Sequence, residues 1–179
     1  MSGPVRSARA VGRWAWSAAL AVTPALTIVP ALAAVPSLAG FPPQFLPLTA
    51  QACFLRPAGV APVCLQLEEP RNLRQYVMGM QLRPPLPALQ GMWFAYASPT
   101  VARFWMHQTP EPLDMLFIRD GRVIAIVAAA APCMRLPCRR YGPDQAVDGV
   151  LEIGAGEAAR LGIGEGTVLN ITALSPSAR

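Results

Sequence analysis

The histidine at position 107 is the only one in the chain, and histidine is the side chain best suited to proton transfer near neutral pH. A histidine that acts as a base needs an acid to orient it, and Asp114, at the start of the next apolar run, is the candidate. Together they could serve as acid and base in a hydrolase-like enzyme. The structural alternative is that His107 lies in a loop and that Asp114 caps a turn or accepts backbone N–H groups.

Three further side chains could join these two. Glu152 lies in an apolar segment, where a carboxylate needs a partner, and Arg83 is a suitable cation. A structural ion pair between them is one interpretation. The other places both with Trp105 at the polar end of a cleft, so that the expected binding residues are Arg83, Trp105, His107, Asp114 and Glu152.

Large side chains within apolar segments are predicted to form the core, and Met92, Trp105 and Met106 belong to this group. The wall of a ligand pocket is the alternative for them. Gly162, Gly164 and Gly166 precede a predicted strand and not a helix, so they do not form a phosphate-binding loop. The sequence therefore predicts no cofactor.

The four cysteines stand at positions 53, 64, 133 and 138. An even number of cysteines in an exported chain indicates disulfides, and the two local pairings, Cys53–Cys64 and Cys133–Cys138, are favoured because each loop contains proline or glycine. A metal site is the alternative. Neither spacing matches a zinc site and only one histidine is present, so no metal is expected.

The first residues have the features of an export signal. Arginines at positions 6, 9 and 13 precede an apolar run over 14–29, which ends near Ala31-Leu32-Ala33. These features predict a signal peptide over residues 1–33, cleaved after Ala33, and a periplasmic or secreted protein. The alternative is an uncleaved anchor, since residues 14–34 could just span a bilayer.

The charge distribution limits the partners. The formal net charge is +5, yet the arginines are scattered and do not form a basic stripe interleaved with aromatic residues. Binding of nucleic acid is therefore not expected. The predicted partner is an unknown small ligand or an envelope protein, and membrane contact is expected only through an uncleaved signal segment. With 53% hydrophobic and 14% charged residues, the chain is not typical of disordered proteins.

The remaining chain divides by composition. Residues 34–61 are predicted to be a Pro-rich tether that contains the first part of a disulfide loop, residues 62–173 a mostly β domain, and residues 174–179 a C-terminal tail. Asp120-Gly121 between two apolar runs predicts a hairpin of 113–119 with 122–129. Further strands are predicted over 62–69, 91–97, 101–106, 150–153 and 167–173.

Two short helices accompany these strands. The first is predicted over 72–80, with Asn72 as N-cap and with Leu73, Tyr76, Val77 and Met80 at helical spacing. The second is predicted over 156–161. Several short strands with frequent Pro and Gly turns indicate a mainly β (α+β) fold, a small sandwich or partly open barrel with two short helices.

The order of short motifs over about residues 62–173 resembles the family called domain of unknown function 192. The motifs are Met78-Gly79-Met80 with Arg83, Gly91-Met92-Trp93-Phe94, Phe104-Trp105-Met106 with Thr109, Pro112-Leu113-Asp114, Asp120-Gly121-Arg122-Val123, and Leu151-Glu152-Ile153 with Gly156. The resemblance implies a small, mostly β domain, often behind a signal peptide, without an assigned activity. Tyr76 stands where the family often has Arg.

Three functions are compatible with these features. The first is a non-catalytic exported module that binds a small ligand or a partner protein in a cleft rimmed by Trp105, His107 and Asp114. The second is an extracytoplasmic hydrolase-like enzyme that uses His107 and Asp114. The third is a structural envelope protein. The absence of a catalytic constellation in the sequence favours the first function.

Overall fold

The computed structural model describes residues 42–55 and 60–174, and this part of the chain is mainly β. The predicted signal peptide, residues 1–33, lies outside the described residues. Within the described ranges no helix is long and apolar enough to cross a membrane.

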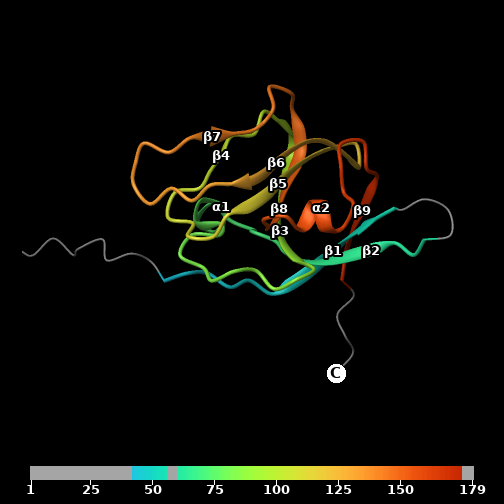
Figure 1. Ribbon diagram of the computed structural model, residues 1–179, viewed down its shortest axis with the longest axis horizontal. Helices are drawn as coiled ribbons and strands as arrows, with labels where there is room; N and C mark the ends of the chain where they lie inside the picture. The colour runs from blue at the N-terminus through green and yellow to red at the C-terminus, as the bar shows by residue number, and fades with distance from the viewer. Residues whose placement is uncertain (1–41, 56–59, 175–179) are drawn as a thin grey trace, which may run out of the picture. The chain divides into compact units, whose positions relative to one another are not determined.

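A seven-stranded mixed sheet dominates the structure, with the strand order β6-β5-β8-β3-β2-β1-β9 (Figure 1). Only β2 and β3 run parallel, and every other neighbouring pair is antiparallel. The strands are β1 (Leu48–Phe54), β2 (Val63–Glu68), β3 (Gln90–Thr100), β5 (Leu113–Arg119), β6 (Arg122–Ala130), β8 (Val147–Gly154) and β9 (Leu169–Ala173). A second, two-stranded sheet pairs β4 (Phe104–Trp105) with β7 (Arg140–Tyr141).

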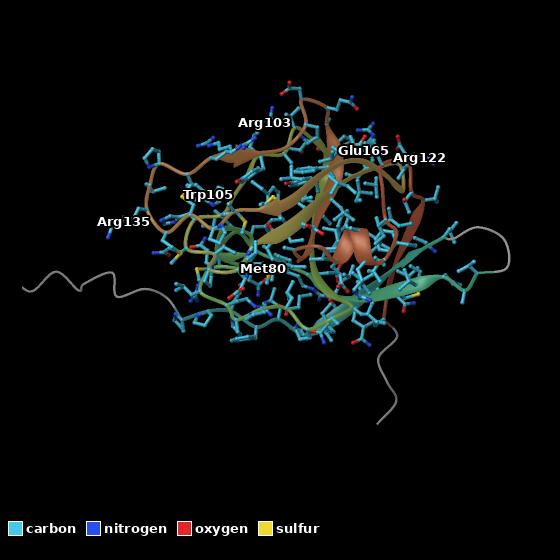
Figure 2. The ribbon with its side chains drawn as sticks, in the orientation of Figure 1. Met80, Arg103, Trp105, Arg122, Arg135 and Glu165 are labelled. Carbon is cyan, nitrogen blue, oxygen red and sulfur yellow. A yellow bond between two sulfur atoms is a disulfide. The ribbon has the colours of Figure 1, made fainter. Side chains whose placement is uncertain are left out.

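The two edge strands of the large sheet approach each other. Arg122 of β6 forms an isolated bridge with Val168, and the N–H of Val123 donates to the carbonyl of Thr167 over 3.0 Å. Figure 2 shows Arg122 and Glu165 together at this end of the sheet. No continuous ladder joins β6 to β9 in the described residues, so the fold corresponds to the partly open barrel of the sequence prediction.

The sheet is apolar on both faces. One face packs Phe54, Leu67 and Leu151 against α2 (Glu157–Arg160) and the turn after it. The other face carries the buried Met92 and Met106, which confirms that both belong to the core. The strands β5 and β8 contribute to both clusters, and this explains why burial does not alternate along them.

The predicted hairpin and helix caps are confirmed. Asp120 and Gly121 both have positive φ, 49° and 65°, as a two-residue type I′ turn requires. The helix α1 spans Leu73–Met78, and the side chain of Asn72 accepts a hydrogen bond from the N–H of Gln75 over 3.0 Å. The predicted strand 101–106 is shorter than expected, because only β4 within it forms a ladder.

The predicted apolar face of α1 is not buried. Leu73 is 80% exposed and Val77 57% exposed, and only Met80, beyond the end of the helix, is buried. A helix of six residues has fewer than two turns, so one face cannot lie flat on the sheet along its whole length. Tyr76 is the residue of α1 that packs, with its ring centroid 5.9 Å from that of Phe94.

The prediction of a tether over 34–61 is wrong for residues 42–54. Strand β1 lies inside the sheet between β2 and β9, and its residues Ala50, Ala52 and Phe54 are buried. The segment before it is also fixed, because Gln44 donates hydrogen bonds to the carbonyl of Gln75 within α1 and to that of Gly79 at its C-cap. The physical reason is the alternation of buried and partly exposed residues in β1, which contains no proline.

Both predicted disulfides are present. Cys53–Cys64 links β1 to β2 at directly facing positions of the ladder, and Cys133–Cys138 closes the loop between β6 and β7. All four cysteines of the chain are therefore paired.

Candidate functional site

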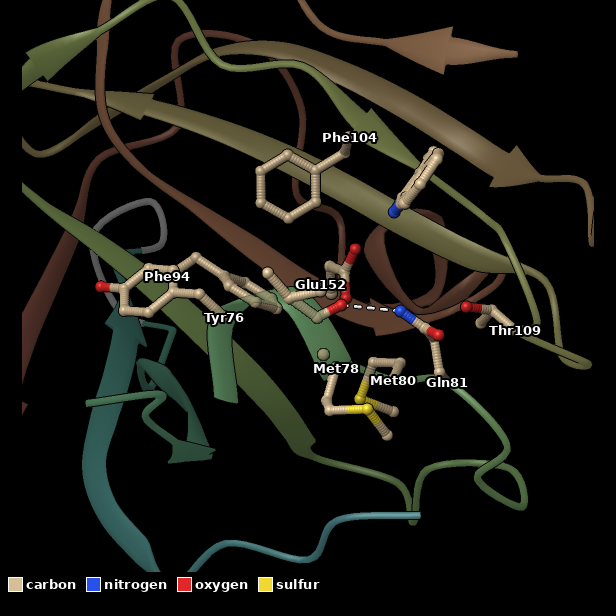
Figure 3. Close-up of a pocket in the computed structure, with 11 residues that line it drawn as sticks. Tyr76, Met78, Met80, Gln81, Phe94, Phe104, Thr109 and Glu152 are labelled. Atoms are coloured by element: carbon tan, nitrogen blue, oxygen red, sulfur yellow. Dashed lines mark hydrogen bonds between the residues drawn. The ribbon is translucent and has the colours of Figure 1, made fainter. Parts of the chain in front are cut away.

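A pocket of about 40 Å³ lies between α1, the turn that follows it, β4 and the centre of the large sheet. The side chains that line it are mostly aromatic or sulfur-containing, and Glu152 is the one acidic side chain among them. Figure 3 shows Glu152 at the centre of this lining, with Phe104 on one side and Met78 and Met80 on the other. A wider groove of about 230 Å³ adjoins the pocket and shares Tyr76, Val77, Phe94, Phe104 and Trp105 with it.

Glu152 is held at the pocket by the register of the sheet. It lies on β8 between Met92 of β3 and Met115 of β5, and all three side chains lie on the same face. Its side chain is 4% exposed, and no group among the described residues donates a hydrogen bond to it. Burial raises the pKa of Glu152 to about 8, so the carboxyl is mainly protonated at neutral pH.

Aromatic rings form one wall of the pocket. Phe94 contacts Tyr76 and Phe104 edge to face, with centroid distances of 5.9 Å and 5.0 Å. The hydroxyl of Tyr76 donates to the carbonyl of Ala95, which fixes the first ring of this series. In the adjoining groove, burial raises the pKa of Tyr96 to about 12, and the charges of Tyr76 and Glu152 contribute to this rise.

Trp105 lies at the rim and is 39% exposed, so its assignment to the core was wrong. The reason is the register of β4, where Trp105 lies between the partly buried Phe104 and the buried Met106. Because successive side chains of a strand point to opposite sides, Trp105 faces outward when its neighbours face inward. His107 lies beside it, with ring centroids 5.3 Å apart, but His107 is not among the residues that line the pocket.

Asp114 lies on the opposite face of the sheet. It is buried, and its two carboxylate oxygens accept the N–H groups of Ala129 over 2.8 Å and of Ala158 over 3.0 Å. Asp114 therefore joins β6 to the start of α2. Neither oxygen accepts a hydrogen bond from His107, so the structure does not assemble the acid–base pair of the hydrolase-like alternative.

Arg83 is also absent from the pocket. Its guanidinium donates two hydrogen bonds of 2.7 Å to Glu68, and both side chains are buried. The predicted pair of Arg83 with Glu152 was therefore wrong. Met92 faces Glu68 on one side and Glu152 on the other, so the two acids lie two strands apart, a separation of about 10 Å. Arg83 contacts the acid on β2.

Of the five residues expected from the sequence, the structure thus brings Trp105 and Glu152 to one pocket and leaves His107 beside Trp105, outside the lining. Tyr76, Phe104 and Thr109 also line the pocket, although the sequence does not predict them as site residues. No sequence signal distinguishes a pocket-lining aromatic residue from a core aromatic residue. Within the described ranges, no group of three or more His, Cys, Asp or Glu residues could hold a metal ion.

These features define a class of small, mainly β domains with a curved mixed sheet, two short helices and a pocket on one face. The chain belongs to the family of domain of unknown function 192, described as an uncharacterized ACR, whose sequence profile matches residues 56–171. The resemblance noted from the motifs is confirmed.

Two solved structures are similar to this chain. One is described as a putative transcription regulator from Sinorhizobium meliloti 1021, with 27% identity, a TM-score of 0.62, and coverage of 71% of this chain and 96% of that one. The other is a protein of unknown function from Novosphingobium aromaticivorans DSM 12444, with 31% identity, a TM-score of 0.61, and coverage of 68% and 84%. A comparison with curated proteins finds no match.

Proposed function

We propose that this protein is a non-catalytic module of the cell envelope that binds a small ligand in the Glu152 pocket. The observation that carries the proposal is the burial of a carboxyl group that has no partner in the described residues and that faces an open space. Burying such a group costs stability when nothing pairs with it. A ligand that supplies the missing partner gains an interaction that water cannot easily replace.

The hydrolase-like alternative receives no support from the geometry, because Asp114 is saturated by backbone N–H groups on the other face of the sheet. Binding of an envelope protein, the other partner expected from the sequence, stays a prediction.

Binding is tested by thermal shift against a panel of metabolites and glycans, with turnover assays run beside it. We expect at least one compound to raise the melting temperature of the natural protein and to lose this effect in Glu152→Gln, which keeps the size of the side chain. Glu165→Gln is the matched control, because Glu165 is exposed and lies far from Trp105 (Figure 2). The proposed binding site would be contradicted if no compound raises the melting temperature, or if a compound that does so has the same effect on both variants.

Export is supported by the two disulfides, which are typical of oxidising compartments. We expect exported protein to begin at Ala34 when its N-terminus is sequenced. An N-terminus at Met1 or Ser2, together with reactive thiols in protein from the cytosol, would exclude the signal peptide and the envelope location.

A further inference from the structure

We propose that the ligand of the Glu152 pocket is a small organic cation, a protonated amine or a quaternary ammonium group on an apolar body. Its charged group would contact the carboxylate of Glu152, and its body would lie in the adjoining groove. This inference rests on the proposed function, since it names the chemistry of the ligand for that same pocket.

The charge balance of the buried acidic side chains favours a cation. Three acidic side chains are buried in the described part of the chain. Glu68 pairs with Arg83, and Asp114 accepts two backbone N–H groups. Among these three, only Glu152 has neither a counter-charge nor a hydrogen-bond donor in the described residues. A cationic group of a ligand would supply the missing counter-charge.

The neighbouring arginine of the groove does not supply this cation. Arg103 lines the groove, but its guanidinium pairs with Asp144 and donates to the carbonyls of Ala102 and Pro143. These contacts use both terminal nitrogens of the Arg103 side chain. A cation at Glu152 must therefore come from outside the described protein groups.

The aromatic wall of the pocket also favours a cation. The rings of Tyr76, Phe94, Phe104 and Trp105 line both the pocket and the groove. The faces of aromatic rings carry partial negative charge and attract cations, most strongly where water is excluded. Aromatic walls around one carboxyl group thus favour a positive ligand over a negative one.

The volume of the pocket limits the size of the charged group. A space of about 40 Å³ exceeds what one water molecule requires but is too small for a drug-sized molecule. The charged group that enters it is therefore small. The groove of about 230 Å³ beside it offers room for an apolar body, since its lining contains Val77 and Phe94 as well as Tyr96.

The test uses three probes with the same aromatic body and different head groups: 2-phenylethylammonium, 2-phenylethanol and 3-phenylpropanoate. Their affinities for the natural protein are measured by calorimetry at neutral pH. We expect the ammonium compound to bind about tenfold more tightly than the alcohol, because a charge-assisted contact replaces a neutral one. The carboxylate compound should bind most weakly.

Two additional readouts locate the contact. Glu152→Gln should lower the affinity for the ammonium compound about tenfold and leave that for the alcohol unchanged, whereas Glu165→Gln should change neither. Binding should also release protons, seen as a heat that varies with the ionisation enthalpy of the buffer. The neighbouring Tyr76 and Tyr96 have raised pKa values and stay protonated, so this proton comes from Glu152.

The outcomes separate this inference from the proposed function. Equal affinities for the ammonium compound and the alcohol, or tighter binding of the carboxylate compound, would contradict the inference that the ligand is a cation. The proposal of a small-ligand site would remain. If none of the three probes binds, the inference of a cationic ligand is also contradicted. The thermal-shift panel of metabolites and glycans then tests whether the pocket binds any small ligand. Circular dichroism of Glu152→Gln shows whether the variant is folded. Binding of 2-phenylethanol to this variant with unchanged affinity is a second measure that the pocket is intact.

Discussion

Arg83 donates two parallel hydrogen bonds of 2.7 Å to Glu68, and this pairing leaves Glu152 without a cation two strands away. Both members of the pair are buried, and the guanidinium also lies 4.8 Å from the centroid of the Phe45 ring. The arginine therefore stabilises the join between β2 and the segment before β1. The carboxyl of Glu152 faces the pocket instead.

The buried pair should contribute strongly to folding. We expect Arg83→Met to lower the free energy of unfolding by about 3–5 kcal/mol, because it leaves the Glu68 carboxylate buried without a counter-charge. Urea denaturation measures the change. The control is Arg71→Met, which removes an exposed partner of Glu69 at 3.8 Å and should cost less than about 1 kcal/mol. If both substitutions lower the free energy of unfolding equally, the buried Arg83–Glu68 pair contributes no more to stability than the exposed pair.

The free energy of unfolding should fall as the pH rises from about 5 to about 8. The folded protein keeps a proton on Glu152 up to a pKa of about 8, whereas the unfolded chain loses it near the ordinary value of 4.5. Unfolding therefore releases a proton in this window, and the free energy of unfolding drops most steeply, by about 1.4 kcal/mol per pH unit, midway between the two pKa values. Denaturation curves at several pH values measure this slope. Glu152→Gln should remove it, and an unchanged slope in the variant would place the titrating group elsewhere.

Asp114 should act through backbone contacts and not through chemistry. We expect Asp114→Asn to cost about 1–3 kcal/mol, because an amide can accept only one of the two N–H groups and turns its own NH₂ toward the other. Amide exchange should accelerate at Ala129 and Ala158. His107→Ala, at a half-buried position beside Trp105, serves as the comparison and should leave both amides protected. Unchanged exchange in Asp114→Asn would argue against the assigned role.

Gly149 should tolerate no side chain. A methyl group added there would lie 2.3 Å from Cη2 of Trp93 and 2.6 Å from the carbonyl oxygen of Phe94. We expect Gly149→Ala to destabilise the fold by about 1–3 kcal/mol or more, since the ring and the neighbouring strand must both move. Thermal melting measures the loss. Gly164→Ala is the matched control, because no atom lies within 4 Å of the added carbon, and comparable melting of both variants would contradict the close approach.

Local signals explain which elements could be predicted from the sequence. The hairpin at Asp120-Gly121, the Asn72 cap and both disulfides each depend on residues that are close in the chain. Strand β1 was missed because it follows a Pro-rich stretch that is typical of linkers. Its alternation becomes meaningful only beside β2 and β9.

The candidate site could be predicted only in part. A carboxylate within an apolar strand identified Glu152, since its cost of burial follows from the residue type alone. Its surroundings depend on the strand register, which places Met92 between Glu68 and Glu152 and so decides which acid Arg83 contacts. The role of Asp114 depends likewise on the N–H of Ala158, far along the chain, which no local pattern connects to it.

The position of β1 has a consequence for the order in which the molecule can assemble. This strand, among the first of the domain to be synthesised, pairs on one edge with β9, and Cys53 faces Asn170 there. The sheet is therefore completed only when β9, the last strand of the described residues, is present, and pairings over such long stretches of chain form slowly. Until β9 is available, the outer edge of β1 presents unpaired N–H and C=O groups, with which another chain could pair.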